Sequence, residues 1–118
     1  KNAYLYFNQF KNNKNIFIDD FDENNSYFLC QIILKSKKIR NGLLNILKQK
    51  KIGHSIHYAK PLPSLYYYKK KYNIPKENYK DSKFYSDRVL SLPVYNLLKE
   101  KEIRKICLII KNYCEQLN

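Results

Sequence analysis

The thirteen residues Ile56–Tyr68, with the sequence IHYAKPLPSLYYY, gather the side chains of this 118-residue chain that are best suited to chemistry. They include a histidine, a lysine and four tyrosines. Pro61 and Pro63 exclude a continuous helix and fix the backbone φ angle, so the polar side chains project from a held turn. We interpret this turn as one wall of a binding site.

The chain offers no self-contained catalytic or metal-binding motif. Its two glycines, Gly42 and Gly53, are too far apart for a glycine-rich phosphate loop. No nucleophile elbow, paired-histidine zinc motif or cysteine signature occurs. His54 and His57 are three residues apart and would face opposite sides of a strand, so they cannot share a metal. We therefore predict a binding surface with no catalytic, cofactor-binding or metal-binding residue of its own.

The chain is strongly basic, with 23 lysines and arginines against 10 acidic residues and a net charge of +13. Such an excess suits an anionic partner, or it reflects a coding bias that enriches lysine, asparagine, isoleucine and tyrosine together. Arginine makes the commonest specific base contact, and only three basic residues are arginine. We favour the bias and do not expect nucleic acid as a partner. Tyr66–Tyr68 beside Lys69–Lys71 is typical of single-strand binders, but the tract is short. An equally plausible interpretation is that these tyrosines pack at the edge of the core.

Three cysteines, Cys30, Cys107 and Cys114, form no C-x-x-C motif. On one helix Cys107 and Cys114 would be separated by a rise of about 10 Å, too far for a disulfide. We expect buried free thiols and a reducing, cytoplasmic location. No apolar run approaches the ~18 residues of a membrane span, and the chain does not start with a signal pattern. Its first residue is not methionine, which suits a chain that begins inside a longer protein.

Apolar periodicity predicts a sheet covered by helices. Ser26–Lys35 is almost continuously apolar, as a strand covered on both faces would be. Gly53 is expected to cap the helix before it. The expected helices are Lys1–Asn12, Ser36–Lys51, Ser64–Tyr72 and Lys99–Gln116. The other expected segments are extended stretches at Ile16–Ile18 and Ile52–Tyr58, a polar loop at Asn73–Lys83, a helical turn at Phe84–Arg88 and a strand at Val89–Val94.

Three linked segments follow a recognisable order. A strand and helix pattern, Y-x-F-x-I then R-x-x-L-x-x-x-L, corresponds to Tyr27–Ile33 and Arg40–Leu47. A pattern G-I-x-x-x-x-H-Y-P-x-P-L-H corresponds to Lys51-Ile52-Gly53, displaced by one position, followed by His57–Pro63. A pattern S-x-x-V-L-S-L-P-M-x-P-x-L-x-x-x-E-I corresponds to Ser86–Tyr95 and ends at Leu98 and Glu102-Ile103. These motifs resemble the C-terminal domain of the DegT/DnrJ/StrS sugar aminotransferases, which use pyridoxal phosphate.

The sequence departs from the family pattern at three positions. Ala59 replaces the usual proline, Asn96 replaces the proline after the L-S-L-P strand, and Pro63 replaces the usual second histidine. The last change removes a side chain that could contact substrate, and it points to a divergent substrate or a relaxed function.

The resemblance implies an α/β (α+β) small domain over residues 1–118, a few-stranded sheet covered by helices, as in the C-terminal domain of fold-type I aminotransferases. The large domain with the Schiff-base lysine would precede Lys1, because nothing here matches its S-x-K-x-x-x-x-G-E-G-G segment. This chain alone is therefore expected to be inactive and to bind no cofactor, although the complete enzyme would carry pyridoxal phosphate.

The complete enzyme would transfer an amino group, with glutamate as donor, to a nucleotide-linked keto-sugar in amino-sugar biosynthesis for a surface polysaccharide or glycoconjugate. It would work as a homodimer. His57 and Tyr58 would line the sugar pocket, and Lys60 would lie near the diphosphate. Two alternatives stay open: a non-catalytic remnant that binds sugar nucleotides, and a basic nucleic-acid-binding domain.

Overall fold

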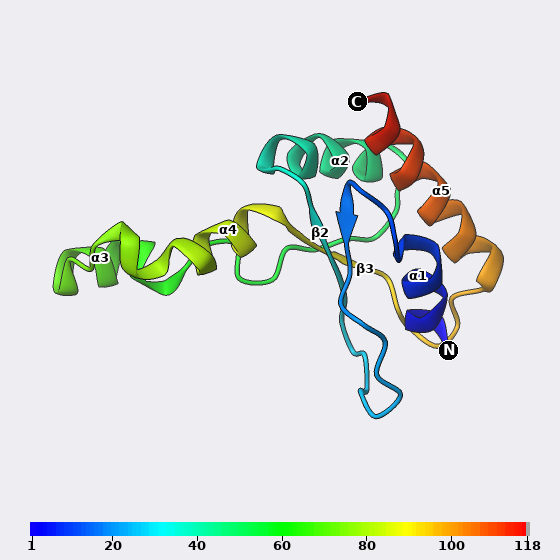
Figure 1. Ribbon diagram of the computed structural model, residues 1–118, viewed down its shortest axis with the longest axis horizontal. Coiled ribbons are helices and arrows are strands. Elements are labelled where there is room, and N and C mark those ends of the chain that lie inside the picture. Colours follow the sequence, from blue (N-terminus) through cyan, green and yellow to red (C-terminus); the bar gives the residue numbers. More distant parts are fainter. Residues whose placement is uncertain (118) are drawn as a thin grey trace.

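The computed structural model describes residues 1–117, which form a small antiparallel sheet and five α-helices (Figure 1). The α/β class expected from the sequence is confirmed. Two short 3-10 turns, Leu62–Ser64 and Lys76–Tyr79, flank α3. The elements in chain order are α1 (Asn2–Phe10), β1 (Ile16–Phe17), β2 (Cys30–Leu34), α2 (Lys37–Gln49), α3 (Tyr66–Tyr72), α4 (Lys80–Arg88), β3 (Val89–Leu92) and α5 (Glu100–Gln116).

The sheet has the order β1-β2-β3, with both neighbouring pairs antiparallel. Along β2, burial alternates, with Cys30, Ile32 and Leu34 buried and the residues between them half-buried. The prediction that this strand is covered on both faces is therefore wrong. The fully buried strand is β3, whose residues are buried at every position.

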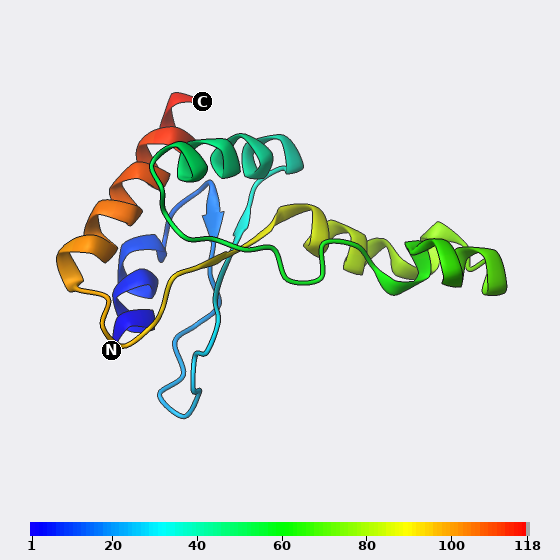
Figure 2. The same ribbon diagram turned by 180° about the vertical axis from the view of Figure 1, so that it is seen from behind.

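One face of the sheet carries the core (Figures 1 and 2). Helices α1, α2 and α5 supply its other side, and α1 lies against α5. Apolar side chains of these helices recur on one face of each, as the helical period requires. The largest fully buried side chains of the core are Tyr6, Phe10, Ile32, Leu34, Leu43, Leu47, Leu90, Ile103 and Ile110.

Two predicted boundaries are wrong for local reasons. The strand expected from Ser26 begins only at Cys30, because Tyr27 has a left-handed φ of 47° and donates its backbone N–H to the Asn25 side chain. Such a turn cannot continue a strand ladder. The expected polar loop Asn73–Lys83 contains a 3-10 turn and the first turn of α4, which begins at Lys80.

Gly53 does not cap α2, so that prediction is also wrong. The chain reverses two residues earlier, where Lys51 has a φ of 55°. The Ile52 N–H donates to the Leu47 carbonyl at 2.9 Å, and the Lys51 N–H donates to the Lys48 carbonyl at 3.0 Å. This bond pair is a Schellman motif with lysine at the left-handed position that usually holds glycine.

A buried arginine joins α2 to the junction of α4 and β3. Arg40 Nη1 donates to the Ser86 and Val89 carbonyls, each at 3.1 Å, and Nε donates to the Asn41 side chain at 2.9 Å. Burial lowers the pKa of Arg40, and the charge of Asp87 opposes that shift. The guanidinium thus satisfies two carbonyls where the chain passes from helix to strand.

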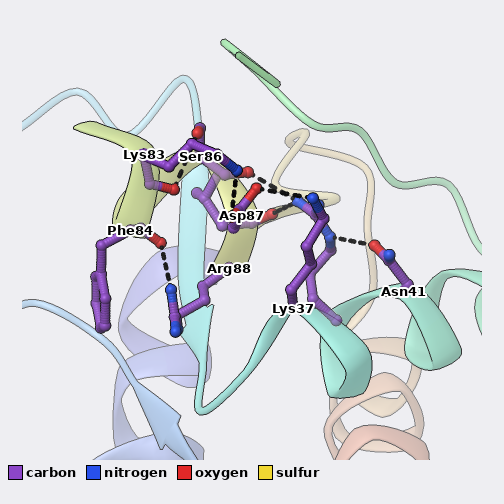
Figure 3. Close-up of polar contacts among 9 residues, drawn as sticks. Lys37, Asn41, Lys83, Phe84, Ser86, Asp87 and Arg88 are labelled. Atoms are coloured by element: carbon purple, nitrogen blue, oxygen red, sulfur yellow. Dashed lines mark hydrogen bonds and ion pairs between the residues drawn. The ribbon is translucent and has the colours of Figure 1, made fainter. Parts of the chain in front are cut away.

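Asp87 lies between two lysines in the same region (Figure 3). Its carboxylate is 2.6 Å from Lys83 Nζ and 3.1 Å from Lys37 Nζ. The hydrogen bond from Lys83 is the largest cause that lowers the pKa of Asp87, Lys37 adds to it, and burial opposes both. Arg88, next in the chain, lies over the Phe84 ring and donates to the Phe84 carbonyl, so its contacts are structural.

The three cysteines are free and buried, as expected. Burial raises the pKa of Cys30 and Cys107 to about 12 and that of Cys114 to about 11. These thiols therefore stay protonated near neutral pH and pack as small apolar side chains.

The left-handed position of Lys51 gives a stability prediction. We expect Lys51→Gly to raise the free energy of unfolding by about 0.5–1 kcal/mol, because glycine adopts φ near 55° without a Cβ penalty. Urea unfolding followed by far-UV circular dichroism measures the change. The matched control is Lys50→Gly, at a φ of −85°, which should lower stability. A stabilising effect at both positions, or at neither, would contradict the assignment.

The pair of lysines at Asp87 gives a pH prediction. Because its folded pKa lies below the ordinary value of 3.8, Asp87 stabilises the fold above that pH and loses this contribution as the pH falls below it. We expect Asp87→Asn to cost about 1 kcal/mol at pH 7, since the lysines are half-exposed. The difference from the parent chain should shrink towards about pH 2. Urea titrations at several pH values test this, and a difference that stays constant would contradict it. Asp20→Asn, at an exposed position, should behave like the parent chain.

Candidate functional site

The segment between α2 and α3 runs beside β3. Ser55 and Ser91 exchange both backbone hydrogen bonds, at 2.8 and 3.2 Å, and form an isolated antiparallel bridge. The predicted extended stretch Ile52–Tyr58 thus pairs at a single residue. It ends at Tyr58, where φ is 56°. The bridge fixes the position of the residues after Ser55 along β3.

His57 points its Nδ1 atom at two serine hydroxyls. Ser91 Oγ is 3.1 Å away and Ser55 Oγ is 3.2 Å away. Among residues 1–117 the other ring nitrogen, Nε2, has no hydrogen-bond partner. The imidazole is therefore oriented by β3 and keeps one nitrogen for another contact.

The polar contacts continue from Ser91 across the sheet. Gln31 on β2 lies opposite Ser91 in the strand register, and its Nε2 atom is 3.4 Å from Ser91 Oγ. The Tyr85 hydroxyl on α4 donates to Gln31 Oε1 at 2.7 Å. Burial is the main cause that raises the pKa of Tyr85, and Asp19 adds to it. Four side chains from the loop, β3, β2 and α4 thus form one hydrogen-bonded row, which we call the His57 relay: His57, Ser91, Gln31 and Tyr85.

Tyr58 is largely exposed and makes no side-chain hydrogen bond with the described residues. The residue is 84 % exposed, and its hydroxyl has no hydrogen bond within the described chain. Its backbone is nevertheless left-handed, a conformation that is strained for an aromatic residue. The fold therefore holds a tyrosine in a strained backbone conformation although most of its ring faces solvent.

Lys60 is exposed and forms no ion pair with any described residue. Pro61 behind it is buried, and its carbonyl accepts hydrogen bonds from the Ser64 N–H and hydroxyl. The three predicted site residues are thus close in sequence, but among the described residues no side-chain hydrogen bond joins them to one another. Only His57 is anchored to the sheet.

The relay partners of His57 were not predicted as site residues. Ser91 appeared only within the family motif Ser86–Tyr95, and Gln31 and Tyr85 were not predicted to have any role. A usable signal was present, because Gln31 and Ser91 are each the only polar residue in a short apolar strand. Their pairing depends on the register, which the sequence does not state.

A second surface lies on α3, which projects away from the sheet (Figures 1 and 2). No residue of α3 is buried. The rings of Tyr68 and Tyr72, four residues apart on the helix, stack with centroids 6.1 Å apart, but Tyr66 and Tyr67 are 80 % and 61 % exposed. The interpretation that Tyr66–Tyr68 serve core packing is therefore wrong. We call Tyr66–Tyr72 the tyrosine arm.

Neither a metal cluster nor a membrane span is present in the described part of the chain. No group of three histidine, cysteine or acidic side chains within residues 1–117 lies close enough to hold a metal ion. None of the helices there has both the length and the apolar character to cross a bilayer.

Solved structures with a similar fold are aminotransferases. A protein described as a sugar aminotransferase, Spr1654 from Streptococcus pneumoniae, matches in its PMP form with a TM-score of 0.84, 23% identity and 99% coverage of this chain. Helicobacter pylori PseC, an aminotransferase of pseudoaminic acid biosynthesis, matches with a TM-score of 0.80, 23% identity and 98% coverage. DesV from S. venezuelae matches with a TM-score of 0.81, 16% identity and 99% coverage. At these identities the likeness concerns the fold.

This chain spans 30% of the Spr1654 chain and 31% of the PseC and DesV chains. No curated protein sequence matches it. The sequence model of the DegT/DnrJ/EryC1/StrS aminotransferase family matches residues 1–111. With nearly the whole chain covered and the fold in agreement, this protein belongs to the DegT/DnrJ/EryC1/StrS aminotransferase family.

Proposed function

We propose that residues 1–118 are the C-terminal small domain of a pyridoxal-phosphate-dependent aminotransferase that acts on a nucleotide-linked keto-sugar. Tyr58 carries the proposal for the site, because a strained and exposed tyrosine suits a ligand contact. The order of the motifs from Tyr27 to Ile103 supports the domain assignment.

The described residues do not fit a cofactor site of their own. A Schiff-base lysine is activated by desolvation or by a neighbouring cation in a sheltered pocket. Every lysine in residues 1–117 is solvent-exposed except Lys111, which is half-buried and donates to Gln9 at 2.9 Å. We therefore assign pyridoxal phosphate, and the transfer chemistry that it supplies, to a large domain outside this chain. This chain alone is inactive in this proposal.

In the complete enzyme, the small domain supplies one wall of the sugar pocket. His57 offers the ring nitrogen that the fold leaves unpaired, and Tyr58 offers its hydroxyl. Lys60 is exposed two residues further on and is placed near the diphosphate, where a flexible ammonium suits phosphate oxygens. The net charge of +13 favours an anionic substrate.

The remaining partners follow from the family resemblance. Glutamate is the proposed amino donor, the product belongs to amino-sugar biosynthesis for a surface polysaccharide or glycoconjugate, and the location is cytoplasmic. A homodimer is proposed for the complete protein. The tyrosine arm supports it, because its exposed rings are unusual for a surface without a partner. Its Lys69–Lys71 could face the acidic segment 19–23 of a second copy.

Whole-protein chemistry tests the proposal. The reading frame upstream of Lys1 should encode about 250 further residues with an internal lysine motif, the length of a large domain. The complete protein should then show cofactor absorbance that borohydride reduction traps on that lysine. A missing upstream domain would favour the sugar-nucleotide-binding remnant. Affinity for arbitrary oligonucleotides that falls steeply with salt would favour the nucleic-acid binder. A complete protein without trappable cofactor would end the aminotransferase proposal.

Tyr58→Phe tests the role of the hydroxyl in the complete enzyme. We expect kcat/KM for the sugar to fall roughly 3–10-fold, the effect of one lost neutral hydrogen bond. The free energy of unfolding should not change, because the ring is kept and the hydroxyl has no partner in the fold. Tyr95→Phe is the matched control at another exposed tyrosine, 59 % exposed, and should leave both quantities unchanged. Unaltered kinetics in Tyr58→Phe would refute the role.

A further inference from the structure

The His57 relay has a definite direction, and this direction bears on what His57 can do. Tyr85 Oη is 2.7 Å from one terminal atom of the Gln31 amide, and Ser91 Oγ is 3.4 Å from the other. Hydrogen bonds between two oxygens have lengths of roughly 2.5–3.0 Å, whereas those from nitrogen to oxygen are longer. The short contact therefore fits an O–H···O bond, with the Gln31 carbonyl oxygen towards Tyr85.

The opposite amide orientation fits less well. It would put an oxygen 3.4 Å from Ser91 Oγ, which exceeds the O–H···O range of roughly 2.5–3.0 Å by more than it exceeds the N–H···O range of roughly 2.7–3.2 Å. The Gln31 amide nitrogen therefore faces Ser91. Because an amide NH₂ only donates, Ser91 Oγ accepts from Gln31.

Ser91 then has its own hydrogen to place. The nearest acceptor is His57 Nδ1 at 3.1 Å. The backbone N–H and carbonyl of Ser91 are hydrogen-bonded to Ser55. They fix the position of the Ser91 hydroxyl and do not compete for its hydrogen. Nδ1 therefore accepts from Ser91, and the Ser55 hydroxyl, 3.2 Å from the same nitrogen, can share this acceptor. A neutral imidazole with an accepting Nδ1 carries its hydrogen on Nε2.

We propose that Ser91, Gln31 and Tyr85 are positioning residues that hold His57 as the Nε2–H tautomer, so that neutral His57 presents a hydrogen-bond donor. That donor suits a hydroxyl, carbonyl or phosphate oxygen of a ligand, and it excludes neutral His57 as a general base at Nε2. The importance for catalysis rests on the proposed function, whereas the tautomer is a property of this chain alone.

The second histidine supplies an internal comparison. His54 Nδ1 is 2.8 Å from the Ile52 carbonyl oxygen. A carbonyl oxygen only accepts, so His54 must carry a hydrogen on Nδ1. The two histidines of this chain are therefore expected in opposite tautomers when both are neutral.

Nitrogen NMR tests the proposal without any ligand. The ¹⁵N-labelled 118-residue chain, whose helices and sheet bury a common core, is examined at about pH 8.5, where an ordinary imidazole is neutral. Long-range ¹H–¹⁵N correlation spectra distinguish the protonated ring nitrogen from the bare one. We expect a bare Nδ1 in His57 and a bare Nε2 in His54.

Two variants separate the relay from an intrinsic preference of the ring. Ser91→Ala should lower the ratio of Nε2–H to Nδ1–H in His57 about fivefold, the value of one net hydrogen bond. Tyr85→Phe should lower it in the same direction, because Gln31 then loses the partner that fixes its amide. His54 should not change in either variant, and dispersed amide spectra confirm that both remain folded.

The remaining outcomes overturn the proposal. A parent chain with His57 protonated on Nδ1, or in an even mixture, contradicts the direction of the relay. An unchanged ratio in Ser91→Ala removes Ser91 from control of the tautomer. A change in Ser91→Ala without one in Tyr85→Phe overturns the part played by Gln31 and Tyr85. None of these results bears on the cofactor-trapping experiment, so the two proposals fail separately.

Discussion

The hydrogen bonds from Arg40 on α2 to the junction of α4 and β3 are the constraint on which the other contacts depend. A helix that passes directly into a strand leaves carbonyl groups without partners, and burying them unpaired costs about 1–3 kcal/mol each. Arg40 donates to the carbonyls of Ser86 and Val89, one on each side of that transition. Strand β3 can therefore begin fully buried, with α2 as its support.

The placement of β3 decides which side chains meet on each face of the sheet. Leu90 and Leu92 turn to the helices and complete the core. Ser91 turns the other way, where its register partner Gln31 and the bridging Ser55 meet it. A polar residue is tolerated there because each of its groups has a partner. The helical face thus supplies stability, and the opposite face supplies the hydrogen bonds that orient His57.

The sequence predicted the class of fold, the main helices and the cysteine state, because these depend on periodicity and burial. His57 and Tyr58 were named as site residues from their types and from the family motif, and that assignment stays a prediction. The sequence could not predict the relay, because the meeting of Gln31 with Ser91 requires the register of two strands far apart in the chain. It also missed the exposure of Tyr66 and Tyr67, since a tyrosine suits a core edge and a free surface equally.

The wrong prediction for Gly53 draws attention to how the segment Lys51–Tyr58 is held. In the family pattern G-I-x-x-x-x-H-Y, the glycine stands seven residues before the tyrosine. Counted back from Tyr58, that position is Lys51, not Gly53. Lys51 does adopt the left-handed angle, and so does Tyr58 at the other end of the segment. Each left-handed residue costs about 1 kcal/mol or more. Two such reversals, with the Ser55 bridge between them, leave the intervening backbone few alternatives. Gly53 does not adopt a left-handed φ, and the restricted segment holds His57 beside Ser91.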